Sequence, residues 1–327
     1  MVSISDLIAL VGAFLSSLLL LALVLRFAVR LGLVAAPNER SSHSDERPTG
    51  GGVAIVVPVF SALLWLFFDG TSYAGGVAIA CGGLALIGYL DDVRDLGAGL
   101  RFGCQLLAVV IALWALALGY PWWVLAAIGF LLLWHVNLYN FMDGIDGIAA
   151  VQTLVFCLGV QALGAGLPGA PGLLLWAMTG ATLGFTAYNW PPARIFMGDV
   201  GSLFLGLLIG VLAIQLHELG QVPIVASLIL LTGFWFDASY TLGIRLLSGQ
   251  KFTQAHRSHL YQRVTDRLGH KGTTLLFGAM AVCYLLPLAW ASMRFSGWAY
   301  ACLAIAVLPY LLGAIHFKAG RLLPESA

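Results

Sequence analysis

Residues 122–147, with the sequence WWVLAAIGFLLLWHVNLYNFMDGIDG, join a long apolar run to two carboxylates. The run covers 122–139 and is long enough to cross the hydrocarbon core of a bilayer. Asp143 and Asp146 follow it directly, although only 9% of the residues in the chain are charged. An Asp at the centre of a membrane helix costs roughly 2.5–3.5 kcal/mol on insertion scales. Acids kept beside such a run therefore indicate ion, proton or phosphate chemistry.

The composition excludes a soluble globular protein. Of the 327 residues, 60% are hydrophobic, and the mean hydropathy is +0.94, whereas a soluble surface needs many more charges. We therefore predict an all-α polytopic membrane protein with about eleven transmembrane helices. The eighth apolar run is short. The runs lie at 7–25, 53–68, 74–90, 104–120, 122–139, 148–165, 172–189, 203–217, 222–242, 274–291 and 298–316.

The basic residues predict how this bundle is oriented. Cytoplasmic loops are enriched in Lys and Arg. With the N-terminus outside, every one of the 16 Lys and Arg residues except Arg294 falls on the inner side. Eleven crossings then put the C-terminus in the cytoplasm.

The predicted loops place any loop-borne function on the cytoplasmic side. Outer connections have only a handful of residues, whereas several inner ones are longer, so we expect one integral-membrane domain over residues 1–327. Its functional loops would be 30–52, 91–101, 137–147, 190–202 and 246–272.

Asp91 and Asp92 form the first candidate site, at the end of the third run. Carboxylates this close cannot all ionise cheaply without a cation, an Arg or a shared proton. Such a pair suits a general base or a Mg²⁺ site. The alternative is a solvated helix end that Arg94 and Arg101 balance.

The second candidate is the polar stripe in 137–147. A spacing of three places Asn137, Asn140, Asp143 and Asp146 along one drifting helical face. Their amide and carboxylate oxygens would make a surface for a hard cation or a metal-bound phosphate. A polar helix cap with turn glycines is the alternative.

The third candidate is Asp199, just before the eighth run. Pro191 and Pro192 break the preceding helix, so a new helix begins near Asp199. Its free N–H groups would attract anions, and Asp199 could hold a cation that bridges to phosphate. Asp199 could equally be only an N-cap.

The fourth candidate is a basic loop. His256, Arg257, His259 and Arg263 lie within eight residues and would suit a nucleotide pyrophosphate. The alternative is an inside-positive loop that touches anionic lipid. For Asp237, inside the ninth run, we expect a structural role, paired with Arg245 or with another helix.

Together these elements resemble the polyprenyl-phosphate N-acetylhexosamine-1-phosphate transferases, of the glycosyltransferase 4 type. The resemblance runs from about residue 30 to 265. It is carried by Asp91-Asp92, by Asn140-Phe-Met-Asp143-Gly-Ile-Asp146-Gly, by Phe196-Met-Gly-Asp199-Val-Gly-Ser202 and by the His/Arg loop. It implies ten or eleven helices in the bacterial inner membrane, with a cytoplasmic site. It also implies transfer of a sugar 1-phosphate from a UDP-sugar to undecaprenyl phosphate, with release of UMP and with Mg²⁺, or Mn²⁺, as cofactor.

The resemblance also implies a role for each candidate residue. Asp199 would bind the metal. Asn140 would lie beside the metal and the diphosphate. Asp91 or Asp92 would deprotonate or orient the lipid phosphate, and a covalent acyl-phosphate is less favoured. Asp143 and Asp146 would shape the nucleotide end. Diphosphate or sugar would be held by Arg194, His256, Arg257, His259 and Arg263.

One departure from the usual pattern bears on the sugar. Relatives that act on GlcNAc or MurNAc-pentapeptide carry consecutive histidines, whereas here His259 is followed by Tyr261 and Gln262. This version resembles the branch that initiates O-antigen or related lipopolysaccharide glycans. It favours an N-acetylated 6-deoxyhexosamine, such as FucNAc or QuiNAc, over GlcNAc. We expect membrane lipid around the protein and no nucleic-acid partner. A homodimer is compatible with this prediction.

An ion- or proton-coupled transporter is the main alternative function. Paired Asp residues in helices also mark proton relays, which lie near the bilayer midplane. The candidate acids here map instead to predicted helix ends on the cytoplasmic side.

Overall fold

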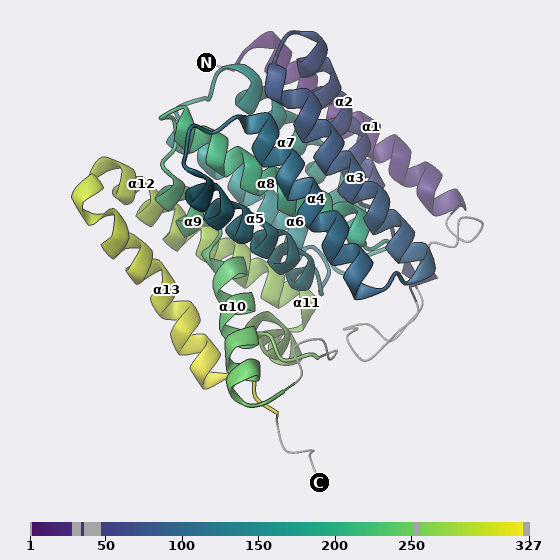
Figure 1. Ribbon diagram of the computed structural model, residues 1–327. Coiled ribbons are helices and arrows are strands. Elements are labelled where there is room, and N and C mark those ends of the chain that lie inside the picture. The colour runs from purple at the N-terminus through teal and green to yellow at the C-terminus, as the bar shows by residue number, and fades with distance from the viewer. Residues whose placement is uncertain (1, 28–33, 36–46, 251–255, 323–327) are drawn as a thin grey trace.

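The computed structural model describes residues 2–27, 34–35, 47–250 and 256–322. Parts of the predicted loops 30–52 and 246–272 therefore lie outside the described residues. The described chain is almost entirely helical (Figure 1). Its α-helices are α1 (Ile4–Phe27), α2 (Val53–Phe68), α3 (Ser72–Arg94), α4 (Ala98–Leu116), α5 (Trp122–Met142), α6 (Ile148–Leu163), α7 (Gly169–Asn189), α8 (Asp199–Glu218), α9 (Ile224–Leu230), α10 (Thr232–Leu247), α11 (Leu260–Met280), α12 (Leu286–Arg294) and α13 (Ala299–His316).

Three kinds of short element complete the described fold. A π-helical turn, Ala281–Leu285, joins α11 to α12, and a 3₁₀ turn, Ser296–Trp298, precedes α13. Strands β1 (Val34–Ala35) and β2 (Arg47–Pro48) pair antiparallel, with Val34 opposite Pro48.

Every one of the eleven predicted apolar runs lies on helical structure. The ninth run, 222–242, covers α9 and α10, which meet at a bend of 75°. Within the described ranges, seven helices are long and apolar enough to cross a membrane, or eight if this bent pair forms one span. Helices α2 and α6 are apolar but have only 16 residues each. The prediction of an all-α polytopic membrane protein is confirmed, whereas its count of eleven transmembrane helices stays a prediction.

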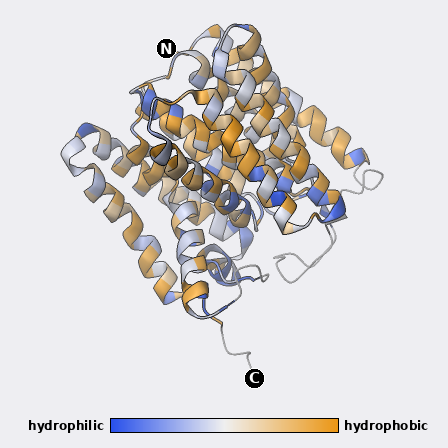
Figure 2. Cartoon of the chain, in the orientation of Figure 1, coloured by the Kyte–Doolittle hydropathy of each residue, from blue (hydrophilic) through white to orange (hydrophobic). Residues whose placement is uncertain are grey.

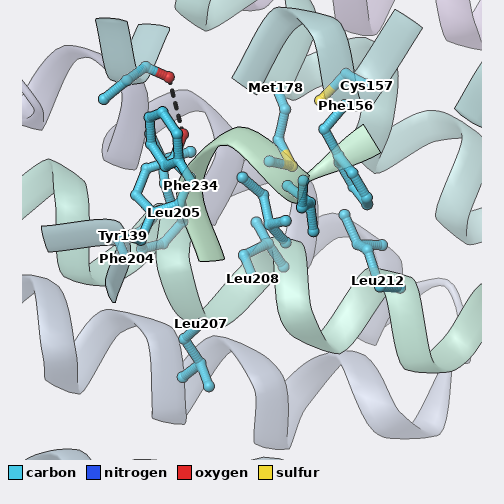
Figure 3. Close-up of a cluster of buried hydrophobic side chains, with 14 of the residues drawn as sticks. Tyr139, Phe156, Cys157, Met178, Phe204, Leu205, Leu207, Leu208, Leu212 and Phe234 are labelled. Carbon is cyan, nitrogen blue, oxygen red and sulfur yellow. Dashed lines mark hydrogen bonds between the residues drawn. The ribbon is translucent and has the colours of Figure 1, made fainter. Parts of the chain in front are cut away.

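Helix α8 forms the centre of the bundle. In an 18-residue apolar stretch of α8, 89% of the residues are buried, whereas the corresponding share in α1 is 17%. It packs against α3 and α5 most extensively, and also against α2, α6, α7 and α9. Figure 3 shows its apolar side chains, such as Phe204 and Leu208, among residues of neighbouring elements. The Tyr139 hydroxyl in this core donates to the Ala149 carbonyl at 2.8 Å, so its polar atom is satisfied.

The outer surface of the bundle is apolar, as contact with lipid requires. Figure 2 shows hydrophobic residues over most of the visible helices, with hydrophilic ones concentrated toward their lower ends. Large aromatic side chains such as Trp114, Trp122 and Trp298 are exposed. Trp is enriched where membrane helices meet the water interface.

Close packing fixes where α8 begins. Gly88 of α3 lies against the backbone of Asp199 and Val200, and a Cβ at this position would overlap the Asp199 carbonyl. Next to this contact, the chain before α2 pairs with the chain before α8. Phe196 N donates to Pro48 O at 2.9 Å, and Gly51 N donates to Phe196 O at 2.9 Å. The sequence neighbourhood of Asp199 is thus held from two sides.

We expect Gly88→Ala to destabilise the protein, because the new methyl group would meet backbone that cannot rotate away. Overpacking of this kind costs about 1–3 kcal/mol. Gly83→Ala is the matched control in the same helix, since a Cβ there meets nothing within 4 Å. Thermal unfolding in detergent should show a lower midpoint for Gly88→Ala and an equal or higher one for Gly83→Ala. Equal midpoints for the two variants would contradict the close contact.

Candidate functional site

Asp92 joins α3 to the first turn of α8. Its Oδ1 accepts a hydrogen bond from Asp199 N at 3.0 Å, and its Oδ2 accepts one from Val200 N at 3.3 Å. The first N–H groups of a helix have no partner within that helix, and a carboxylate there also interacts favourably with the helix dipole. Asp92 therefore caps α8 from a neighbouring helix.

Asp91 faces a different set of partners from Asp92. Arg101 Nη1 donates to Asp91 Oδ2, and Leu96 N donates to Asp91 Oδ1 at 2.6 Å. The same Nη1 lies 3.8 Å from Asp199 Oδ2. Arg101 thus links an acid of α3 to the acid that begins α8.

Asn140 brings α5 into the same site. Its Nδ2 donates to Asp199 Oδ1 at 2.8 Å and to Ser202 Oγ at 2.9 Å. The Asp199 side chain is 28% exposed, so solvent or a ligand can reach it. Asp91, Asp92, Asn140 and Asp199, which are up to 108 positions apart in sequence, therefore meet at one point.

The electrostatics of this carboxylate cluster (Asp91, Asp92, Asp143 and Asp199) favour a bound cation or proton. Among the described residues, Arg101 is the cation in contact with its members, so the described part of the cluster has an excess of negative charge. Burial, followed by the charges of Asp199 and Asp92, raises the pKa of the Asp143 carboxyl well above its ordinary value of 3.8. A positive ion beside the cluster would remove this penalty.

Asp146 belongs to a separate set of contacts. Its Oδ2 accepts from Ala193 N at 2.9 Å and lies 3.8 Å from Arg47 Nη1, while His270 Nδ1 lies 3.1 Å from its Oδ1. Burial by itself would raise the pKa of Asp146. The hydrogen bonds of His270 and Ala193 N and the charges of His270 and Arg47 outweigh burial, and the pKa falls below 3.8. Asp146 thus ties three chain segments together.

The basic loop lies at the start of α11. Arg257 forms an exposed ion pair with Asp266 at 2.9 Å, and Arg263 Nη2 donates to the Arg321 carbonyl. The rings of His256 and His259 lie 4.9 Å apart, centroid to centroid. His259 is 4% exposed at its side chain, and its Nδ1 faces Asp237 at 3.6 Å.

Tyr261 connects this loop to the polar stripe 137–147. Its hydroxyl donates to the Phe141 carbonyl at 3.1 Å. The hydroxyl also occupies the space that a Cβ at Gly144 would need. The basic loop therefore approaches the carboxylate cluster through Tyr261. The other predicted donor-binding residue, Arg194, is exposed on the segment between α7 and α8.

Ser202, Arg101, Arg47 and His270 also make close contacts here and were not among the predicted site residues. Ser202 lies three positions after Asp199, at helical spacing, so its place beside Asn140 could have been found from the motif. Arg101 was considered only as a balancing charge. Arg47 and His270 carry no local signal, because their contact with Asp146 depends on the approach of β2 and α11.

The fold and this geometry define a helical membrane protein that gathers carboxylates at helix ends, around the start of its most buried helix. The sequence profile described as glycosyl transferase family 4 matches residues 74–217. Asp91, Asp92, Asn140, Asp143, Asp146 and Asp199 all fall inside this match, and α11 lies beyond it. The match, over less than half of the chain, and the relatives below support the superfamily that the four motifs predict.

Relatives with assigned names cover different shares of the chain. A probable undecaprenyl-phosphate N-acetylglucosaminyl 1-phosphate transferase of Bacillus subtilis is 29% identical over 82% of this chain and 80% of its own length. A decaprenyl-phosphate N-acetylglucosaminephosphotransferase of Mycolicibacterium smegmatis is 32% identical over 56% and 53%. A phospho-N-acetylmuramoyl-pentapeptide-transferase of Nostoc punctiforme is 31% identical over 64% and 63%. The chain thus spans less than two thirds of the latter two relatives.

We expect Asp146→Asn to lower the thermal unfolding midpoint in detergent at about pH 7. Because the folded-state pKa of Asp146 lies below 3.8, its ionised form stabilises the fold above that value. This stabilisation is lost as the pH falls through the folded-state pKa. The difference between variant and wild type should therefore narrow below about pH 4.

Asp95→Asn is the control, since Asp95 is an exposed acid at the end of α3. It should leave the midpoint unchanged at both pH values. Equal midpoints for Asp146→Asn and wild type near neutral pH would show that the contacts of Asp146 add nothing to stability.

Proposed function

We propose that this protein transfers an N-acetylhexosamine 1-phosphate from a UDP-sugar to undecaprenyl phosphate. The products are undecaprenyl-diphosphate-sugar and UMP. The observation that carries the proposal is the convergence of Asp91, Asp92, Asn140 and Asp199 at the start of α8, inside the region that matches the family. Two named relatives support the class, because their names describe transfer of an N-acetylhexosamine phosphate to a polyprenyl phosphate.

The donor atoms beside Asp199 fit Mg²⁺, with Mn²⁺ as the alternative. Mg²⁺ takes oxygen ligands, keeps several waters, and is usually bound through one or two carboxylates together with substrate phosphates. In the described part of the chain, no three His, Cys, Asp or Glu side chains form a ready-made metal site. Asp199 would therefore hold the ion together with Asn140. Rotation of the Asn140 amide by a half-turn would present its oxygen, in place of the nitrogen that now faces Asp199. When bound, the ion neutralises charge on the phosphate oxygens.

The proposed reaction forms one phosphorus–oxygen bond and breaks another. A phosphate oxygen of the lipid attacks the β-phosphorus of the UDP-sugar. The bond from that phosphorus to the oxygen that bridges the two phosphates breaks, and this oxygen leaves with UMP. Asp91 or Asp92 takes the proton of the lipid phosphate, or orients it for attack, and the proton then passes to UMP or water. No covalent intermediate on the protein is needed.

The remaining candidate residues would bind the donor. His256, Arg257, His259, Arg263 and Arg194 supply positive charge and hydrogen-bond donors for diphosphate and sugar oxygens. Asp143 and Asp146 would shape the nucleotide end. Tyr261, which joins the basic loop to the chain beside Asp143, supports a donor that spans both groups.

The site would face the cytoplasm of the bacterial inner membrane. The segregation of all Lys and Arg residues except Arg294 supports this orientation. The transporter alternative has less support, because the relatives named above are transferases. In addition, Asp91 and Asp199 lie at helix termini, whereas a proton relay needs acids near mid-helix.

For the sugar, we propose an N-acetylated 6-deoxyhexosamine such as FucNAc or QuiNAc, with GlcNAc as the alternative. A role at the first step of O-antigen or related lipopolysaccharide synthesis would follow. The replacement of consecutive histidines by His259, Tyr261 and Gln262 supports this choice. The names of two relatives, which specify N-acetylglucosamine, favour the alternative.

We expect purified protein to release UMP when given Mg²⁺, undecaprenyl phosphate and a suitable UDP-N-acetylhexosamine. A panel of UDP-GlcNAc, UDP-FucNAc and UDP-QuiNAc identifies the sugar through the highest kcat/KM. Chelation of the metal should abolish release, and added Mg²⁺ should restore it. Absence of UMP with all three donors, in protein shown to be folded, would exclude the proposed reaction.

Asp199→Asn should reduce turnover on the order of 100-fold or more. Its folding should be retained, because the side-chain oxygen of Asn can still accept the hydrogen bond from Asn140. Ser202→Ala is the matched control: it removes another partner of Asn140 but no charge, so turnover should change only a few-fold. Near-normal turnover of Asp199→Asn would exclude Asp199 from the metal site.

A further inference from the structure

Asp237 of α10 is a carboxylate that the proposed reaction does not yet use. It is fully buried, with 0% exposure. Its Oδ1 accepts from Leu260 N and its Oδ2 from Tyr261 N, both at 2.8 Å, and Thr241 Oγ1 donates to Oδ1 at 3.1 Å. A buried carboxylate is tolerated only when such donors replace water. The two backbone donors are the first N–H groups of α11.

These hydrogen bonds determine where α11 begins. A carboxylate at a helix N-terminus satisfies N–H groups that lack partners and interacts favourably with the helix dipole. His259, the N-cap residue, forms a capping box with Gln262, and its own N–H donates to Gln262 Oε1 at 3.2 Å. The direction in which the chain enters α11, and with it the placement of His256 and His259, is therefore set by Asp237 and Gln262.

Asp237 also faces the His259 ring. The distance from Asp237 Oδ1 to His259 Nδ1 is 3.6 Å. The ring is confined on its other sides by His256, at 4.9 Å, and by Tyr261, at 5.8 Å between centroids. At 3.6 Å this contact is not a hydrogen bond, but the carboxylate and the two neighbouring rings limit how far the imidazole can move.

The same helix start is tied to the carboxylate cluster. Tyr261, whose N–H is bound by Asp237, donates its hydroxyl hydrogen bond to the Phe141 carbonyl. Phe141 lies between Asn140 and Asp143 in the chain. The contacts of Asp237 and Tyr261 therefore set the spacing between the basic loop and the residues around Asp199.

We propose that Asp237 is a positioning residue for the donor diphosphate. It holds the start of α11, and with it His256 and His259, at a fixed place relative to the segment that Tyr261 contacts beside Asp143. The inference rests on the proposed transferase function. It adds a residue that touches no substrate but determines how tightly a nucleoside diphosphate sugar binds, while leaving the lipid phosphate site unaffected.

Steady-state kinetics of UMP release test this role. Asp237→Asn keeps the size of the side chain but loses its charge and one of its two acceptors. It should raise the KM for the UDP-sugar about 10-fold or more, with the KM for undecaprenyl phosphate within about twofold of wild type. Thr241→Val, which removes a donor to Asp237 but no contact with α11, should lower the unfolding midpoint and leave both KM values unchanged.

A double variant separates positioning from general damage. If Asp237 acts through His259, Asp237→Asn added to His259→Ala should change the donor KM by less than about twofold, because the two effects are not additive. Multiplying effects in the double variant, or an unchanged donor KM in folded Asp237→Asn, would overturn the proposal. Wild-type protein that releases no UMP would instead refute the transferase function itself.

Tyr261→Phe provides the test if Asp237→Asn does not fold. It keeps the cap of α11 and removes the hydroxyl that donates to the Phe141 carbonyl. It should raise the donor KM a few-fold without changing that of the lipid phosphate. Identical donor KM values for Tyr261→Phe and wild type would contradict the claim that the placement of this helix start controls donor binding.

Discussion

The pairing of the Asp92 carboxylate with the first two N–H groups of α8 is the contact on which the site depends. It places a side chain of α3 on the end of the most buried helix, at a point where Gly88 allows the two backbones to touch. Asp199 then has one orientation, and Asn140 and Arg101 approach it from α5 and α4. A charge-rich site can exist in so apolar a chain because Asp91, Asp92 and Asp199 have partners on rigid helices.

The sequence predicted the helices well, because membrane crossing imposes long apolar runs that can be read locally. Each of the eleven runs lies on helical structure, but the bend between α9 and α10 and the π-helical turn after α11 had no recognised sequence signal. The meeting of Asp91, Asp92, Asn140 and Asp199 was also predictable, since helix ends on one side of a membrane share one layer. The particular partners of Asp146 and Asp237 were not, because Arg47 approaches from β2, and His270 and the N–H groups of residues 260 and 261 approach from α11.

Two groups of polar residues with different physical character emerge from the structure. The carboxylate cluster is rich in negative charge, partly reachable, and contained in the region that matches the family profile. The basic loop lies beyond that region, and its residues are held by Asp237, Gln262 and Asp266. Under the proposed function, chemistry at phosphate and recognition of the donor would reside on separate parts of the chain, joined by the contacts of Tyr261. Such an arrangement allows the donor-binding part to vary while the reacting part is retained.

The contact between the Tyr261 hydroxyl and Gly144 restricts which residues can occupy positions 144 and 261. Because the hydroxyl fills the volume of the missing Cβ, a larger residue at 144 requires a smaller one at 261. The two positions should therefore vary together among related chains. A basic loop transplanted from a relative would fit only together with its matching partner in the segment before α6.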